Sequence, residues 1–72
     1  MQKWEYLFVN LNYANGEWRA RYVNGKELPN WKKETVYNYA NKIGNEGWEL
    51  VDAPYSIGST DYYWRMVFKR PK

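Results

Sequence analysis

Apolar and polar residues alternate along the first part of the chain, as in a β-strand whose two faces meet different surroundings. In residues 3–13 one side carries Leu7, Val9, Leu11 and Tyr13, and the other carries Trp4, Tyr6, Phe8 and Asn10. Asn15-Gly16 follows and predicts a two-residue hairpin turn, because both turn positions need positive φ. If Ala14 opposes Glu17, the register places Tyr13 opposite Trp18, Leu11 opposite Ala20 and Val9 opposite Tyr22.

The pattern changes after a second turn signal at Asn24-Gly25, which ends the hairpin. Residues 26–33 are expected to form a loop around Pro29. A helix is predicted over residues 33–46, on the helical spacing of an apolar stripe. The stripe contains Val36, Tyr39, Ala40 and Ile43.

Two glycines mark the end of this helix. Gly47 stands where a residue with positive φ completes the last turn, and a glycine adopts that conformation without a Cβ penalty. Gly44 lies one turn earlier, where a glycine costs about 1 kcal/mol relative to Ala. We expect Gly44 to allow close packing, with Trp48 or another aromatic residue as the neighbour.

Two further strands are predicted after the helix, over residues 48–53 and 61–69, with a loop over 54–60 that contains Gly58. In the last strand, Tyr62, Trp64, Met66 and Phe68 share one face, and Tyr63, Arg65, Val67 and Lys69 share the other.

These elements predict the α+β class, with residues 1–72 forming a single small β-β-α-β-β domain. One helix packs on one face of a four-stranded, mainly antiparallel sheet, and strands one and four lie in the sheet interior. The helix is expected to cover the apolar face, which includes Tyr22. The open face, with Arg19, Arg21 and Val23 also on it, is then the candidate binding or interface surface. Its candidate residues are Trp4, Tyr6, Phe8, Arg19, Arg21, Tyr63, Arg65 and Lys69.

Composition limits how so small a domain can be stabilised. A chain of 72 residues buries only about 60–65% of its unfolded surface. Disulfides are excluded because the chain has no cysteine, and a zinc site is disfavoured because it also has no histidine. Five Trp, eight Tyr and two Phe supply bulk to the core instead. Oligomerisation is the other available source of stability.

The same composition argues against an enzyme. Without His or Cys, the commonest general base, nucleophile and metal ligands are missing. Glu5 and Glu49 open two strands, and we interpret them as exposed residues or partners of a nearby Lys or Arg. We therefore expect no catalytic residues, no cofactor and no metal. The net charge of +3 permits an anionic partner without requiring one. No apolar run reaches the length of a membrane span and no signal-peptide pattern is present, which favours the cytoplasm.

Three segments together resemble a known family. The start Lys3-Trp4-Glu5-Tyr6, the segment from Gly44 through Gly47-Trp48-Glu49-Leu50-Val51, and the end Phe68-Lys69-Arg70-Pro71 are similar to domain of unknown function 4177. This family contains short proteins of bacteria and their phages. The resemblance implies a small β-β-α-β-β domain, and it implies no catalytic residues and no settled function.

Two functions follow from the open face. The first is a non-catalytic interaction module that forms a homo-oligomer, most simply a dimer, because large exposed apolar patches usually mark contact surfaces. The alternative is a binder of a nucleotide signal or of single-stranded nucleic acid, such as a phage protein that sequesters the signal between subunits. Aromatic rings stack on bases and guanidinium groups bind phosphates. In the plainest interpretation, the aromatic residues are ordinary cross-strand packing and the arginines are solvated.

Overall fold

The computed structural model describes residues 1–57 and 62–72, and the side chains of residues 55–57, 62 and 63 are not among the described parts. The expected positions of Gly58 and of the strand start at Asp61 therefore lie outside the described residues. In chain order the elements are β1 (Trp4–Ala14), β2 (Glu17–Val23), β3 (Lys26–Glu27), the 3-10 helix η1 (Trp31–Lys33), α1 (Val36–Gly44), β4 (Glu49–Asp52), β5 (Tyr55–Ile57) and β6 (Tyr62–Pro71).

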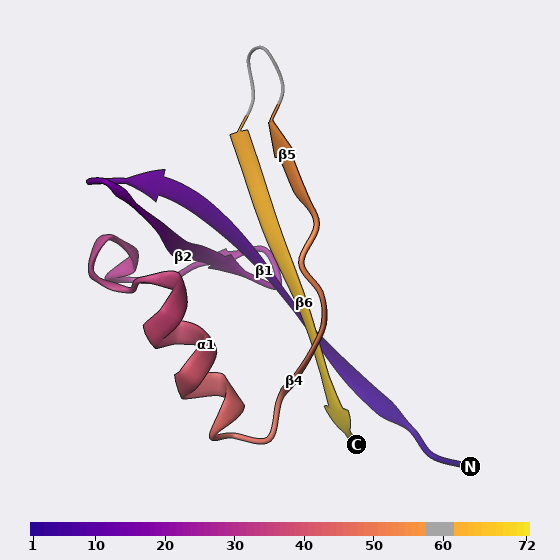
Figure 1. The fold of residues 1–72 in the computed structure, drawn as a ribbon. Helices are drawn as coiled ribbons and strands as arrows, with labels where there is room; N and C mark the ends of the chain where they lie inside the picture. Colours follow the sequence, from indigo (N-terminus) through magenta and orange to yellow (C-terminus); the bar gives the residue numbers. More distant parts are fainter. Residues whose placement is uncertain (58–61) are drawn as a thin grey trace.

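The described strands form one antiparallel sheet in the order β3-β2-β1-β6-β4, with β5 also paired to β6 (Figure 1). The α+β class with one helix is confirmed, and so are the interior positions of the first and last long strands, β1 and β6. The count of four strands is wrong. Beyond Asn24-Gly25 the short strand β3 pairs with β2, and the chain pairs with β6 again after Pro54, where a loop was expected.

The first hairpin follows the predicted register only near its turn. Asn15 and Gly16 both have positive φ, at 53° and 81°, and Leu11 pairs with Ala20 as expected. A β-bulge then shifts the register, so that Val9 pairs with Val23 instead of Tyr22. An added residue in one strand moves each later side chain of that strand to the opposite face of the sheet. Val23 therefore packs against the core, and Tyr22 takes the side of Asn10, the reverse of the expectation for both.

The backbone at the end of β2 favours this bulge. The Asn24 side-chain oxygen accepts a hydrogen bond from the Phe8 N–H at 2.9 Å, and the Asn24 N–H donates to the Phe8 carbonyl at 2.8 Å. These two bonds fix the second turn against β1. The shifted register also brings the apolar Val23 side chain onto the buried face, where burial stabilises it.

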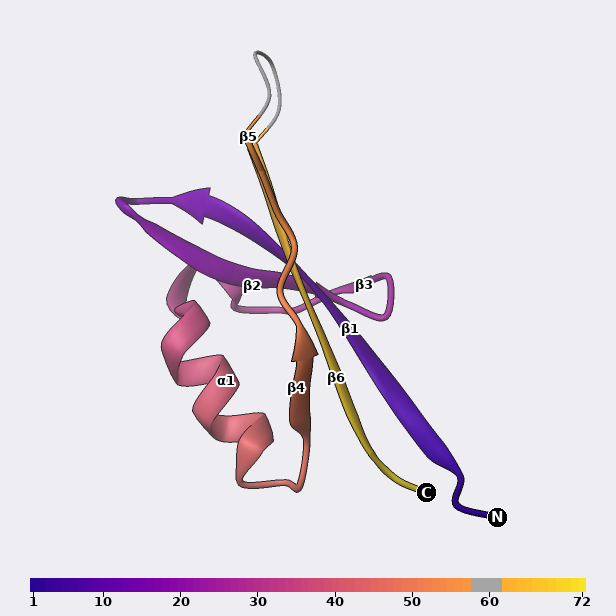
Figure 2. The same cartoon turned by 45° about the vertical axis from the view of Figure 1, so that its right-hand side comes forward.

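The core lies between α1 and one face of the β2-β1-β6 part of the sheet (Figures 1 and 2). The prediction that the helix covers the apolar face is confirmed. The buried apolar residues are Leu7, Val9, Leu11, Ala20, Val36, Tyr39, Ile43, Met66 and Phe68. Only three of them come from the helix, at the spacing of one narrow stripe.

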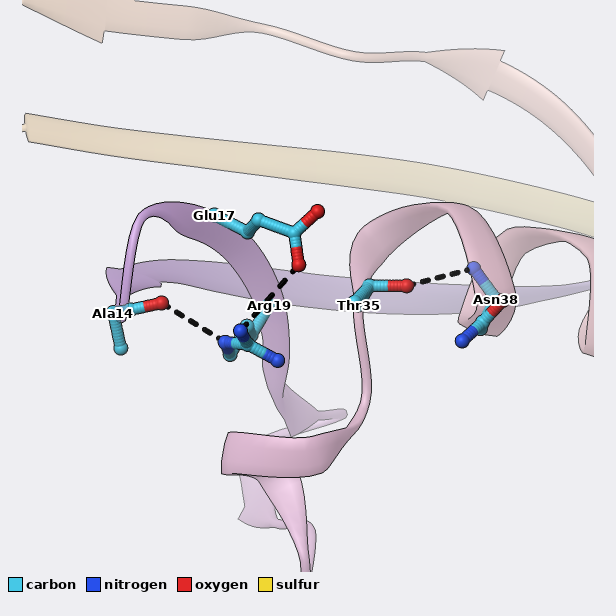
Figure 3. A network of polar contacts seen from close by, with 5 residues as sticks. All are labelled: Ala14, Glu17, Arg19, Thr35 and Asn38. Carbon is cyan, nitrogen blue, oxygen red and sulfur yellow. Dashed lines mark hydrogen bonds and ion pairs between the residues drawn. The ribbon is translucent and has the colours of Figure 1, made fainter.

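The helix begins later than predicted. Residues Trp31–Lys33 form η1, and Glu34 is extended, with φ −104° and ψ 91°. Thr35 is the N-cap of α1, and its hydroxyl accepts a hydrogen bond from the Asn38 N–H at 3.2 Å (Figure 3). The segment before the cap is bound to the edge of β2, since the Ala20 N–H donates to the Glu34 carbonyl at 3.1 Å. The pairing of Glu34 with the edge of β2 thus keeps this residue extended, and the helix begins only after it.

The helix ends through a Schellman motif. The Trp48 N–H donates to the Ile43 carbonyl and the Gly47 N–H donates to the Gly44 carbonyl, both at 3.1 Å. Gly47 has φ 92°, which confirms its predicted role. The expectation of close packing at Gly44 is wrong, because beyond its chain neighbours and the helix's own backbone no described heavy atom lies within 4 Å of a Cβ built there.

The segments that carry the family resemblance meet at Arg70. Its Nε lies 2.8 Å from Glu5 Oε2, and one terminal nitrogen donates to the Glu46 carbonyl at 2.9 Å. Its guanidinium carbon also lies 4.3 Å from the centre of the Trp48 ring. Arg70, near the end of β6, thus joins the start of β1 to the end of the helix. Glu5 is the partner of an arginine, as interpreted from the sequence.

We predict opposite effects for the two glycines at the helix end. Gly47→Ala should lower the free energy of unfolding by on the order of 1 kcal/mol, because a Cβ is penalised at positive φ. Gly44→Ala should raise it by about 0.5 kcal/mol, because it reduces the entropy of the unfolded chain without a clash. Urea unfolding monitored by tryptophan fluorescence measures both. Equal changes in the two variants would contradict this account of the helix end.

We also predict energetic coupling between Glu5 and Arg70. Both side chains are partly exposed, so their interaction should contribute about 0.5–1 kcal/mol, less than a buried pair. A double-mutant cycle with Glu5→Gln and Arg70→Lys measures this coupling from urea unfolding. Free energies of the two single variants that simply add in the double variant would show that the ion pair is not formed in solution.

Candidate functional site

Three aromatic side chains lie in a row on the face of the sheet opposite α1. Trp4, Tyr6 and Phe8 alternate along β1 with the buried Leu7 and Val9, so the strand's pleat directs them to the other side. Their exposed fractions are 39%, 50% and 47%. We call these three residues the aromatic row. It lies on an interior strand of the sheet, as predicted for the open face.

The neighbouring strand β6 places its own residues beside the row. Lys69 pairs with Tyr6 and Val67 pairs with Phe8. The Lys69 ammonium lies 4.3 Å from the centre of the Trp4 ring, a distance at which a cation is attracted to the ring face. Lys69 therefore belongs to this surface, and β4 adds Glu49 opposite it.

Arg65 joins the same surface at its other end. It pairs with Asn10 across β1 and β6, and both side chains are exposed. The position predicted for Tyr63 is two residues away, but the side chain of Tyr63 is not among the described parts. The structure thus brings together Trp4, Tyr6, Phe8, Arg65 and Lys69 from the predicted set.

Arg19 corrects the expectation of an exposed arginine on the open face. It is only 9% exposed. Its Nε donates a hydrogen bond to the Ala14 carbonyl at 2.9 Å, and its terminal nitrogen lies 3.4 Å from Glu17 Oε2 (Figure 3). The guanidinium group closes the end of the first hairpin. No sequence signal distinguishes this arginine from an exposed one.

Arg21 is also held by intramolecular contacts, although its sequence position predicted an open-face residue. It lies at the β-bulge, and its Nε is 2.8 Å from Glu27 Oε2. Its guanidinium carbon lies 4.5 Å from the centre of the Trp31 ring and 5.1 Å from that of Tyr22. The group thus joins β2 to β3 and η1, and is not displayed beside the aromatic row.

The groups that this surface offers to a partner are aromatic rings and a few charged side chains. Within residues 1–57 and 62–72 no group of three or more Asp or Glu side chains is arranged to hold a metal ion. Glu5 is bound by Arg70, and Glu49 is exposed opposite Lys69. The aromatic row offers ring faces and edges, with an ammonium and a guanidinium group at its two ends.

Comparisons with protein families, with curated proteins and with solved structures find no match to this chain. In the described part of the chain, no helix is both long and apolar enough to cross a membrane.

The structure predicts that Arg19 stabilises the fold. Arg19→Met keeps most of the apolar stem but leaves the Ala14 carbonyl without its donor, which should lower the free energy of unfolding by about 1–2 kcal/mol. Lys33→Met, which removes an exposed positive charge, should change it by less than about 0.5 kcal/mol. Thermal and urea unfolding measure both variants. Equal stability of the two would contradict the internal role of Arg19.

Proposed function

We propose that this protein is a non-catalytic interaction module that forms a homodimer through its open sheet face. One observation carries the proposal: the aromatic row of Trp4, Tyr6 and Phe8 lies on an interior strand and remains 39–50% exposed. Contiguous exposed aromatic surface is unusual on a monomer and typical of contact surfaces. Aromatic residues are also the residues that interfaces bury at their centres.

The small core gives a second reason for association. One short helix covers one face of the β2-β1-β6 part of the sheet, and only nine apolar residues of the described chain are fully buried, with partly buried ones packed around them. A domain of this size is marginally stable alone. Packing a second sheet against the open face would bury the aromatic row and add a second apolar layer, with the sheets about 10 Å apart.

The partner that fits this face best is another copy of the chain. A two-fold interface presents the same patch twice, so it requires a surface that complements itself. The open face carries Lys69 and Glu49 opposite one another on neighbouring strands, beside the aromatic row. A two-fold axis close to this pair would bring the Lys69 of one copy towards the Glu49 of the other, with the rings packed at the centre.

The free edge of the sheet fits a second copy less well. β4 exposes Leu50 and Val51, but its two ends carry the acidic residues Glu49 and Asp52. In a symmetric antiparallel pairing of β4 with its copy, these carboxylates lie opposite one another and repel. The β-bulge between Leu50 and Asp52 also bends the edge, which is a common protection against edge pairing.

The alternative, a binder of nucleotides or single-stranded nucleic acid, depended on arginines beside the aromatic row. Two of the three arginines named for that role are held by intramolecular contacts. Arg19 contacts Ala14 and Glu17, and Arg21 contacts Glu27. The positive groups that lie on this face are Arg65 and Lys69. The geometry therefore favours protein–protein contact over phosphate binding.

The experiment is a measurement of molar mass by light scattering and sedimentation. We expect a dimer at micromolar concentration, and the double variant Tyr6→Ser/Phe8→Ser should raise the dimer dissociation constant by about 100-fold or more, because two central aromatic contacts are lost. Tyr37→Ser is the matched control, since Tyr37 is 70% exposed on α1, away from the open face.

A wild-type protein that is monomeric at high micromolar concentration would overturn the proposal. So would a Tyr37→Ser variant that dissociates as readily as the double variant. Thermal-shift measurements with nucleotides and oligonucleotides at low salt, where phosphate contacts are strongest, test the alternative separately.

A further inference from the structure

A small cavity lies on the helix side of the sheet, apart from the aromatic row. Its volume is about 170 Å³, and it opens between the segment before α1 and the helix itself. At about 30 Å³ for each water molecule, it has room for five or six waters, or for a ligand of similar size. It is lined by Leu28, Pro29, Asn30, Glu34, Tyr39 and Lys42.

The wall formed by the loop is fixed at both ends. The Leu28 N–H donates to the Arg21 carbonyl at 2.7 Å, and the Glu34 carbonyl accepts from the Ala20 N–H at 3.1 Å. Between these points, the Trp31 ring stacks on the guanidinium of Arg21. The loop is therefore held against β2 before any ligand arrives, which reduces the entropy cost of binding.

Tyr39 supplies a polar group to this cavity. The residue is 7% exposed and lines the cavity from α1. Within the described residues the Tyr39 hydroxyl has no hydrogen-bond partner. Every described side-chain nitrogen or oxygen that is fully buried does have a partner, so the Tyr39 hydroxyl is not fully buried. The accessible part of Tyr39 therefore includes the hydroxyl. Burial raises the pKa of Tyr39, and the nearby carboxylates of Glu46 and Glu34 raise it further, so the group stays protonated at neutral pH and can donate.

Two opposite charges line the same cavity. Glu34 lies on the loop wall, and Lys42 lies on α1, three residues after Tyr39 and so on the same side of the helix. Neither forms an ion pair with another residue of the described chain. Leu28 and Pro29 add an apolar wall.

We propose that this cavity binds a small zwitterion, with the chemistry of a free amino acid with a short side chain. The ligand's ammonium group pairs with the Glu34 carboxylate, and its carboxylate accepts from Lys42 and from the Tyr39 hydroxyl. Its apolar part packs on Leu28 and Pro29. A simple anion would meet Glu34 and a simple cation would meet Lys42, so the pair of charges selects a ligand that carries both. The site does not depend on the proposed dimer.

The test compares alanine with two smaller molecules that each keep only one of its charges, on the full chain. Alanine carries both charges, ethylamine lacks the carboxylate and propionate lacks the ammonium group. Amide chemical shifts from ¹⁵N-labelled protein at neutral pH and constant ionic strength should show saturable changes with alanine in residues 28–44. Half-saturation with ethylamine or propionate should need at least about tenfold more ligand, because one charge-assisted contact is lost.

Variants assign the contacts. Lys42→Met and Tyr39→Phe should each weaken alanine binding by about fivefold or more, since each removes a donor to the carboxylate. Lys33→Met removes a comparable charge from an exposed residue that does not line the cavity, and should leave the affinity unchanged. The amide spectrum of each variant shows directly whether it is folded.

Three outcomes would overturn the proposal. One is the absence of saturable shifts with alanine in the wild type, a result that needs no variant to fold. The second is binding of propionate or ethylamine as strong as that of alanine, which would indicate a site for a single charge. The third is an equal loss of affinity in Lys33→Met and Lys42→Met, which would indicate a general electrostatic effect.

Discussion

The structure depends on one constraint: a single helix of nine residues must cover one face of the β2-β1-β6 part of the sheet. The helix supplies three buried side chains, so the sheet supplies the rest of the core from alternate positions of β1, β2 and β6. Alternation has a second consequence, because every buried residue of β1 has neighbours on the opposite face. The aromatic row therefore consists of the β1 residues that alternate with the buried ones and point to the opposite face.

With so little core, the chain relies on cations placed over aromatic rings. Arg70 lies over Trp48, Arg21 over Trp31 and Lys69 over Trp4. Two of these contacts are combined with an ion pair, to Glu5 and to Glu27. A planar guanidinium group can stack and donate at the same time, which an ammonium group on a flexible stem does less well. This dual use applies to Arg21 and Arg70, whereas Arg19 is held by its hydrogen bond to the Ala14 carbonyl and its ion pair with Glu17.

The sequence predicted best the features that are fixed locally. Asn15-Gly16 and Gly47 need positive φ, and the structure gives it to them at the expected places. The stripe of Val36, Tyr39 and Ile43 identified the helix face in the same way. These signals work because the backbone conformation and the period of burial belong to a few adjacent residues.

Features that depend on distant partners were not predictable from the chain. The bulge in β2 is fixed by the contact of Asn24 with Phe8 and by the packing of Val23, so no local pattern marks it, and it moved Tyr22 and Arg21 from their expected places. The helix start was missed because Thr35 caps it only once Glu34 is bound to β2. For the candidate surface, the alternation of residues along β1 and β6 was enough to predict the aromatic row and Lys69. The cavity beside Tyr39 could not be predicted in this way, because one of its walls is a loop that is held in place by hydrogen bonds to β2.

The open face and the β4 edge of the sheet are protected differently, and this difference supports the proposed dimer. The edge strand β4 carries acidic residues at both ends and a bulge between them, so strand addition is opposed by charge and by shape. The aromatic row has charged residues beside it but no comparable obstruction. Edge pairing extends a sheet without limit when each added copy offers a new edge. Face-to-face packing about a two-fold axis is closed, because the dimer buries both copies of the face. A protected β4 edge and an accessible face therefore agree with the proposed dimer better than with open-ended growth through β4.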